Sequence, residues 1–287
     1  MTQSNSTRTS SLPSIGLALG GGGVKGLAHI GLLKLLDKYE LKCQRIAGTS
    51  MGAIIGALYA HGLSGADIEE RVRSHLFKKG EPFKDMLKRR HKLFRWAKVL
   101  RFDKNKGALF AANGLFEHLF DELRDINFDE LECTFTAIAT DYESGKESVL
   151  QQGPLLPAIL ASMAVPGVFS PQRIDGRLLL DGGLVNNLPC NHIVDGTDIR
   201  LASDVISLAK TPEPSAIQAL SAALSIMLQR STAITLEQCP PDLVFRVDTD
   251  GLEAFDFHKI DAVLQRGDEA AAAFEEKLIR LLQLEPR

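Results

Sequence analysis

Two successive segments of the sequence each combine a short apolar run, a glycine-containing turn and a helical pattern, and this repeat restricts the fold most strongly. In the first, residues 15–19 precede four glycines and a helical pattern over 25–39. In the second, residues 46–47 precede the turn 48–52 and another helical pattern. Two strand-to-helix units in succession require crossover connections. The sequence therefore predicts an α/β fold of three layers (αβα), with a largely parallel central sheet.

The rest of the chain extends this pattern within one domain. A length of 287 residues with 45% hydrophobic side chains is enough for a sizeable core. We expect residues 1–12 to form a disordered tail, because they are polar and lack the apolar centre of a secretory signal. Residues 13–287 are expected to form a single domain with a basic helical insertion at about 64–125. Further strands are predicted at 135–140, 178–180, 201–208 and 243–247, and helices at 155–164, 215–236 and 259–284.

The first glycine turn, Gly21-Gly22-Gly23-Val24-Lys25-Gly26, matches the GxGxxG pattern of dinucleotide-binding loops. A dinucleotide site also needs an acidic residue after the second strand, where this chain has Gly48-Thr49-Ser50. A Walker loop needs Ser or Thr after the lysine, where this chain has Gly26. Converging backbone amides and a helix N-terminus instead suit stabilisation of an oxyanion. The loop therefore has the character of an oxyanion hole.

The second glycine turn, Gly48-Thr49-Ser50-Met51-Gly52, has the GxSxG pattern of a nucleophile elbow between a strand and a helix. Its flanking glycines permit a sharp turn that exposes the Ser50 hydroxyl at the carboxyl end of a strand. The alternative is that Ser50 simply caps the following helix, a position that serine favours. The strand-turn-helix context and the upstream glycine loop favour the nucleophile.

A serine nucleophile needs a base, and two residues downstream compete for this role. The order Ser50, Asp181, His192 would suit a catalytic triad. However, His192 follows Asp181 by only eleven residues, with no intervening element long enough to return it to Ser50. Asp181 ends an apolar run and precedes two glycines, so it is either a direct base or an Asp-Gly turn residue. Composition does not decide between these interpretations.

Four motifs in order resemble the patatin-like phospholipase family, in the manner of short bacterial members related to the neuropathy-target-esterase group. They are Gly21–Gly26, Gly48–Gly52, Ala161-Ser162-Met163-Ala164-Val165-Pro166 and Asp181-Gly182-Gly183, and the resemblance covers about residues 15 to 190. It implies a Ser50–Asp181 dyad, an oxyanion hole from Gly21, Gly22 and Gly23, and (lyso)phospholipid acyl esters as substrates. It implies no metal and no cofactor. The remaining motif residues, which would support this site, are Lys25, Gly26, Gly48, Gly52, Gly182 and Gly183.

The segment 71–106 is strongly basic, with fourteen Lys or Arg against three Asp or Glu, although the whole chain has a net charge of −3. Its apolar residues recur at helical spacing, so it could contact an anionic membrane, or dock on the core as a side helix with a solvated basic face. Nucleic-acid binding fits poorly, because no recognisable module surrounds the charge. Because the sequence has no run of eighteen apolar residues, we expect a cytoplasmic protein. The basic segment additionally allows peripheral contact with the inner face of the membrane.

Two other functions remain open from the sequence. The first is a lipid-binding regulatory protein that keeps the pocket, against which the intact nucleophile motif argues. The second is a triad esterase that uses His192.

Overall fold

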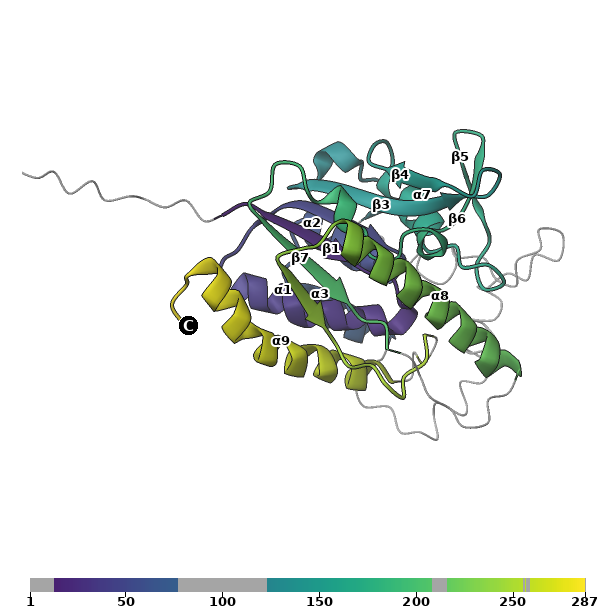
Figure 1. Ribbon diagram of the computed structural model, residues 1–287. Helices are drawn as coiled ribbons and strands as arrows, with labels where there is room; N and C mark the ends of the chain where they lie inside the picture. The colour runs from purple at the N-terminus through teal and green to yellow at the C-terminus, as the bar shows by residue number, and fades with distance from the viewer. Residues whose placement is uncertain (1–12, 77–122, 208–215, 255, 257–258, 287) are drawn as a thin grey trace, which may run out of the picture.

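The computed structural model of the protein describes residues 13–76, 123–207, 216–254, 256 and 259–286. They form an eight-stranded mixed sheet with helices against both of its faces (Figure 1). The described strands are β1 (Ile15–Leu19), β2 (Cys43–Thr49), β3 (Thr134–Asp141), β4 (Glu147–Leu150), β5 (Gln172–Ile174), β6 (Arg177–Asp181), β7 (Ile199–Asp204) and β8 (Leu243–Arg246). The described α-helices are α1 (His29–Lys38), α2 (Met51–Ala60), α3 (Gly65–Leu76), α7 (Leu155–Ser162), α8 (Ala216–Gln238) and α9 (Ile260–Leu282).

The strand order is β5-β6-β3-β2-β1-β7-β8, and β4 pairs with β3. The five strands from β3 to β8 in this order are parallel, whereas the pairs β3–β4, β3–β6 and β5–β6 are antiparallel. The predicted three-layer, largely parallel fold is therefore confirmed. Strands β4 and β5 were not expected, because four and three residues carry too little apolar pattern. The predicted helix over 25–39 begins as a 3₁₀ helix, η1 (Gly23–Ala28), before α1.

The two faces of the sheet are packed differently. Large side chains such as Leu17, Leu19 and Ile46 enter the main core under α1, α2, α7 and α9. On the other face, a row of small residues, Ala18 with Ala47 and Ala202 beside it, meets the segment around the 3₁₀ helix η5 (Cys190–His192). Small side chains allow this segment to approach the sheet closely. The residues just before η5 are thereby brought beside the ends of β1 and β2.

Strands β2 and β6 lie end to end along one edge of β3. The last residue of β2, Thr49, pairs in parallel with Ile138. The last residue of β6, Asp181, pairs in antiparallel fashion with the next residue of β3, Ala139. Strand β4 occupies the opposite edge of β3 at Ile138 and Ala139, so β2 and β6 share one edge and their C-terminal ends face each other. Ser50, which follows Thr49, and Asp181 therefore meet at one point of the sheet.

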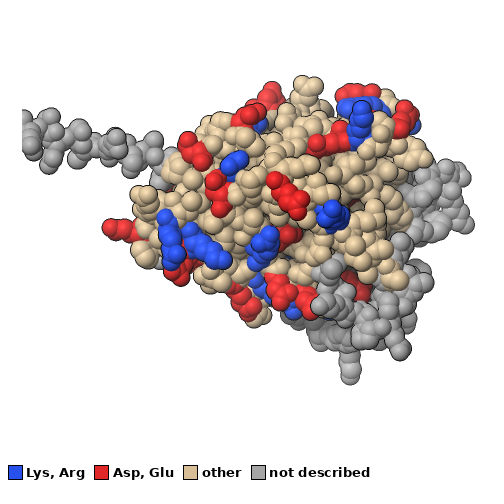
Figure 2. Space-filling model, in the orientation of Figure 1, with Lys and Arg blue, Asp and Glu red and all other residues tan. Residues whose placement is uncertain are grey.

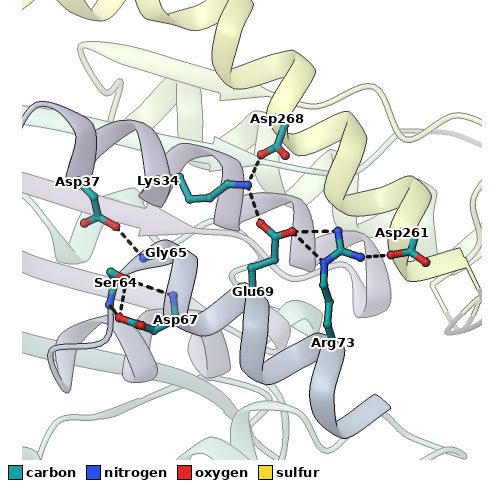
Figure 3. A network of polar contacts seen from close by, with 9 residues as sticks. All are labelled: Lys34, Asp37, Ser64, Gly65, Asp67, Glu69, Arg73, Asp261 and Asp268. Carbon is teal, nitrogen blue, oxygen red and sulfur yellow. Dashed lines mark hydrogen bonds and ion pairs between the residues drawn. The ribbon is translucent and has the colours of Figure 1, made fainter. Parts of the chain in front are cut away.

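Helix α3, the start of the predicted insertion, is tied to the core by polar contacts (Figure 3). Lys34 of α1 forms ion pairs of 2.6 Å with both Glu69 of α3 and Asp268 of α9. Arg73 of α3 pairs with Glu69 and with Asp261 of α9. This network fixes one end of the segment 64–125. The tail 1–12 and the residues 77–122, which hold most of the basic segment 71–106, lie outside the described residues. No helix of the described part is long and apolar enough to cross a membrane.

Candidate active site

Ser50 occupies the turn between β2 and α2 with a strained backbone, φ 54° and ψ −121°. This left-handed conformation costs a residue with a side chain about 1–3 kcal/mol and is concentrated at functional sites. The Ser50 hydroxyl makes no capping hydrogen bond to α2, so it does not serve as the helix cap that the sequence also allowed. A Cβ atom on Gly48 would lie 2.4 Å from the Gly52 carbonyl oxygen, and one on Gly52 would lie 2.2 Å from that of Leu19. The two flanking glycines are thus required for the backbone to close this turn.

The end of helix α7 holds the backbones of both candidate catalytic residues. The buried Ser162 hydroxyl accepts a hydrogen bond of 2.9 Å from the Ser50 amide. The Ala164 carbonyl accepts one of 3.0 Å from the Asp181 amide. In the sequence, the segment 161–166 contributed only to the family resemblance. In the structure, it fixes the separation between the elbow and the end of β6.

The Asp181 carboxyl group is buried, with only one oxygen in a regular hydrogen bond. Oδ1 accepts from the Gly183 amide at 2.7 Å. Oδ2 has no hydrogen-bond partner of normal geometry among the described residues. Burial raises the pKa of Asp181 to about 6, against smaller lowering effects of the Gly183 amide and the nearby Ser50 hydroxyl. A carboxylate oxygen without a hydrogen-bond partner, beside a serine hydroxyl, is in position to accept the hydroxyl proton. Hydrogen bonds between a nucleophile and its base are commonly long in the absence of substrate and shorten when substrate binds.

The glycine loop lies directly beside Ser50. A Cβ atom on Gly21 would come within 3.3 Å of Ser50 Cβ. The Gly21 amide donates to the Asn187 carbonyl at 3.1 Å, so it is already engaged. Among the described residues, no hydrogen bond occupies the amides of Gly22 and Gly23. These two amides are therefore the available donors of the predicted trio.

Two further motif residues hold the glycine loop in place. Gly26 packs against α2, where an added Cβ would lie 2.6 Å from Met51 Cβ. The Lys25 ammonium donates to the Ser207 carbonyl at 3.1 Å. Burial lowers the pKa of Lys25, while the nearby carboxylates of Asp250, Asp256 and Glu253 oppose this effect. Gly26 thus contacts the residue that follows Ser50, whereas Lys25 ties the loop to the segment after β7.

Asn187 was not identified from the sequence, yet it lies between the loop and the base. Its side-chain oxygen would be 2.7 Å from a Cβ on Gly21 and 3.3 Å from one on Gly183. That oxygen is buried without a hydrogen-bond partner among the described residues, while Nδ2 donates to Thr232 at 3.2 Å. Its position in the sequence could have indicated it, because Asn187 follows Asp181 by six residues, in the segment that leads the chain back to the sheet.

His29, also missed from the sequence, supports the start of the glycine loop. Nε2 lies 2.8 Å from the Gly20 carbonyl oxygen, and Nδ1 lies 2.6 Å from the Ser203 hydroxyl. Because a carbonyl can only accept, Nε2 carries the proton and Nδ1 accepts from Ser203. Complete burial lowers the pKa of His29 to about 4, so the ring is neutral at pH 7.

We expect His29→Leu to lower the free energy of unfolding by about 2–4 kcal/mol, because it leaves the Gly20 carbonyl and the Ser203 hydroxyl buried without partners. Urea denaturation followed by circular dichroism measures this. The matched control is His61→Leu at the partly exposed end of α2, which should change stability by about 0.5 kcal/mol or less. Equal stability of His29→Leu and wild type would contradict the supporting role.

His192 lies away from this arrangement. Its Nε2 pairs with Glu147 at 2.9 Å and lies 3.0 Å from the Asn191 side chain. Neither hydrogen bond reaches Ser50 or Asp181. The geometry brings Ser50 and Asp181 together and places His192 in a separate polar cluster with Glu147.

A family model described as patatin-like phospholipase matches residues 17–193, which include the glycine loop, the elbow, Ser162 and Asp181. The chain belongs to the patatin-like phospholipase family. The match ends at η5, so α8, β8 and α9 lie beyond it. The predicted resemblance and its extent are confirmed.

Relatives of this family member differ greatly in length. An uncharacterized NTE family protein of Mycobacterium bovis is 37% identical over 191 residues, covering 63% of this chain and 46% of that protein. Lysophospholipase nte1 of Aspergillus fumigatus is 25% identical over 291 residues, covering 92% of this chain and 18% of that protein. The chain thus spans less than half of the length of these curated relatives. Among solved structures, VipD from Legionella pneumophila has the same fold, with a TM-score of 0.51 at 12% identity, covering 93% of this chain and 67% of that one.

Proposed function

We propose that this family member hydrolyses fatty acyl esters of phospholipids or lysophospholipids through a dyad of Ser50 and Asp181. The observation that carries the proposal is the Asp181 Oδ2 atom, which is buried without a hydrogen-bond partner of normal geometry among the described residues and lies beside the strained Ser50. Family membership and the name of the fungal relative, a lysophospholipase, support a lipid ester as substrate. The position of His192 against Glu147 favours the dyad over a triad.

In the proposed reaction, the Ser50 oxygen attacks the ester carbonyl carbon while Asp181 accepts the hydroxyl proton. The amides of Gly22 and Gly23 donate to the oxygen that becomes negative, a contribution of about 3–4 kcal/mol for each well-placed donor. The tetrahedral intermediate expels the alcohol, which takes the proton from Asp181, and leaves an acyl ester on Ser50. Water then attacks this ester with Asp181 again as base, releasing the fatty acid and restoring the serine hydroxyl.

The direct test is release of fatty acid from lysophosphatidylcholine by the purified protein, with a soluble short-chain ester as a second substrate. Hydrolysis of both that depends on Ser50 supports the proposal. Hydrolysis of the short-chain ester alone would support serine hydrolase activity but would contradict lipid esters as the substrate class.

The proposal predicts a pH dependence set by Asp181. Only the ionised carboxylate accepts a proton, and its pKa lies at about 6. We therefore expect kcat/KM to fall about tenfold for each pH unit below 6 and to level off above it. Steady-state kinetics with the soluble ester between about pH 4.5 and 8 measure this dependence. A kcat/KM that is flat or rises as the pH falls through this range would contradict Asp181 as the base.

A further inference from the structure

Helix α8 carries few charges for a helix at the surface. It has 23 residues, as does α9, but contains only two charged residues against eight in α9. Figure 2 shows the same contrast, with mostly tan surface over α8 and blue and red side chains crowded over α9. A helix face that remains in water normally carries charged and polar residues. The composition of α8 therefore indicates a surface that leaves water during function.

Among the residues that the structure describes, the large exposed apolar side chains are concentrated here. Four of them, together with Arg230, line one groove of about 640 Å³: Leu184, Ile226, Met227 and Ile234, exposed by 37%, 55%, 59% and 38%. We call these five residues the α8 surface. Elsewhere in the described part of the chain, only Tyr142, Val149 and Val194 are large hydrophobic residues with comparable exposure. Such a contiguous patch, in contrast to scattered apolar residues, marks an interaction site.

The α8 surface adjoins the turn that carries the candidate base. Leu184 ends the 3₁₀ helix η4 (Gly182–Leu184), which starts directly after Asp181. The Ser231 hydroxyl of α8 donates to the Val185 carbonyl at 3.3 Å. Leu228 of α8 lies against Gly183, where an added Cβ would be 2.9 Å from its Cδ2. Whatever covers the α8 surface is thus held next to the catalytic turn.

Arg230 indicates the chemistry of the partner. Its side chain is exposed between Met227 and Ile234, and it forms no ion pair with any residue that the structure describes. A lone guanidinium within an apolar ring matches a boundary where acyl chains meet phosphate groups, since arginine binds phosphate while its stem lies against apolar surface.

We propose that the α8 surface docks on a phospholipid bilayer, with Ile226 and Met227 entering the acyl region and Arg230 contacting lipid phosphates. This inference rests on the proposed function, because docking would deliver membrane lipid to Ser50. Glu147, Asn186 and Asn191 line the polar end of the same groove and hydrogen-bond to one another. They lie at the level of the lipid head groups in this arrangement.

Vesicle flotation of the Ser50→Ala protein tests the docking, because the lipid is not consumed and no turnover is needed. The vesicles contain phosphatidylcholine with a minor share of phosphatidylglycerol. The double variant Ile226→Asp/Met227→Asp should lower the partition coefficient at least about tenfold. Arg230→Gln should lower it about fivefold. The control Val194→Asp, at a residue of 40% exposure that does not line the groove, should float like its parent. Thermal unfolding of each variant verifies that it is folded.

Unchanged flotation of the double variant, or no flotation of the parent, would overturn the inference. A parent that is dimeric in sedimentation, becomes monomeric in the double variant and does not float would assign the α8 surface to a second copy of the chain. The proposed function fails by a different readout, the absence of Ser50-dependent cleavage of the soluble ester, so the two failures are distinguishable.

Discussion

Ser50→Ala should lower the rate of ester hydrolysis at least about 10⁴-fold, because the covalent route through an acyl-enzyme is lost entirely. The backbone of residue 50 is strained at φ 54°, a conformation that alanine adopts at a cost similar to that of serine. The variant should therefore fold like wild type, so the loss will report the missing hydroxyl group. Fatty acid release from lysophosphatidylcholine and cleavage of a soluble ester both measure the effect.

The matched control for this variant is Ser144→Ala in the exposed turn between β3 and β4. The Ser144 hydroxyl hydrogen-bonds only within this turn, donating to Asp141 at 2.9 Å and accepting from the Lys146 amide at 3.3 Å, and it should be dispensable for catalysis. More than a tenth of wild-type activity in Ser50→Ala would mean that the protein acts through another nucleophile or without one.

Asp181→Asn should lower kcat/KM about 10²–10⁴-fold, the usual contribution of a general base. Asparagine keeps the shape of the side chain and can still accept the 2.7 Å hydrogen bond from the Gly183 amide, but it cannot take a proton. The decrease of kcat/KM below pH 6 should disappear together with the activity. Kinetics of the variant at several pH values measure both effects, and His192→Ala with near wild-type kcat/KM is the control that separates a dyad from a triad.

The same variant should be more stable than wild type at neutral pH. The pKa of Asp181 is about 6 in the folded protein against an ordinary value of 3.8, so the folded state binds more protons than the unfolded state between these values. Stability from this group is therefore present at low pH and is lost as the pH rises through 6, at a cost of up to about 3 kcal/mol. Asp181→Asn should recover about 1–3 kcal/mol at pH 7.5 and little at pH 4, as measured by urea unfolding. A variant less stable than wild type at pH 7.5 would contradict the claim that the buried Asp181 carboxylate destabilises the folded protein.

His29 has the opposite pH linkage and should partly hide this effect in wild type. Its pKa is lowered to about 4 from 6.5, so the folded state binds fewer protons than the unfolded state between these values. Its contribution to stability is thus lost as the pH falls from 6.5 to 4, whereas that of Asp181 is gained. The difference between the Asp181→Asn variant and wild type isolates the Asp181 contribution, because His29 is common to both proteins.

Local sequence patterns were sufficient for the parallel strands and the two glycine turns. Runs such as 15–19 alternate between two buried faces, and Gly48 and Gly52 mark a backbone that must close tightly around Ser50. These features depend on neighbours in the chain. They predicted the three-layer fold and the residues that surround the site.

Features that depend on distant pairing could not be predicted in this way. The meeting of β2 and β6 along β3 requires the register of Ile138 and Ala139 with two strands that are far apart in the sequence. The engagement of the Gly21 amide by Asn187 arises only when the segment before η5 packs on the small residues of the sheet. The burial of His29 likewise depends on the distant Ser203, which hydrogen-bonds to its ring. The exposure of Ile226 and Met227 is likewise visible only after α8 is placed, because their spacing is also that of a core helix.

Covalent labelling with a fluorophosphonate tests the central claim most directly, because the phosphorus centre mimics the tetrahedral intermediate of acyl transfer. Intact-mass spectrometry and peptide mapping are applied to wild type, Ser50→Ala and Asp181→Asn. The dyad predicts one adduct on wild type located on Ser50, no adduct on Ser50→Ala, and much slower labelling of Asp181→Asn. A folded wild-type protein that gains no adduct, or an adduct at a residue other than Ser50, would contradict it.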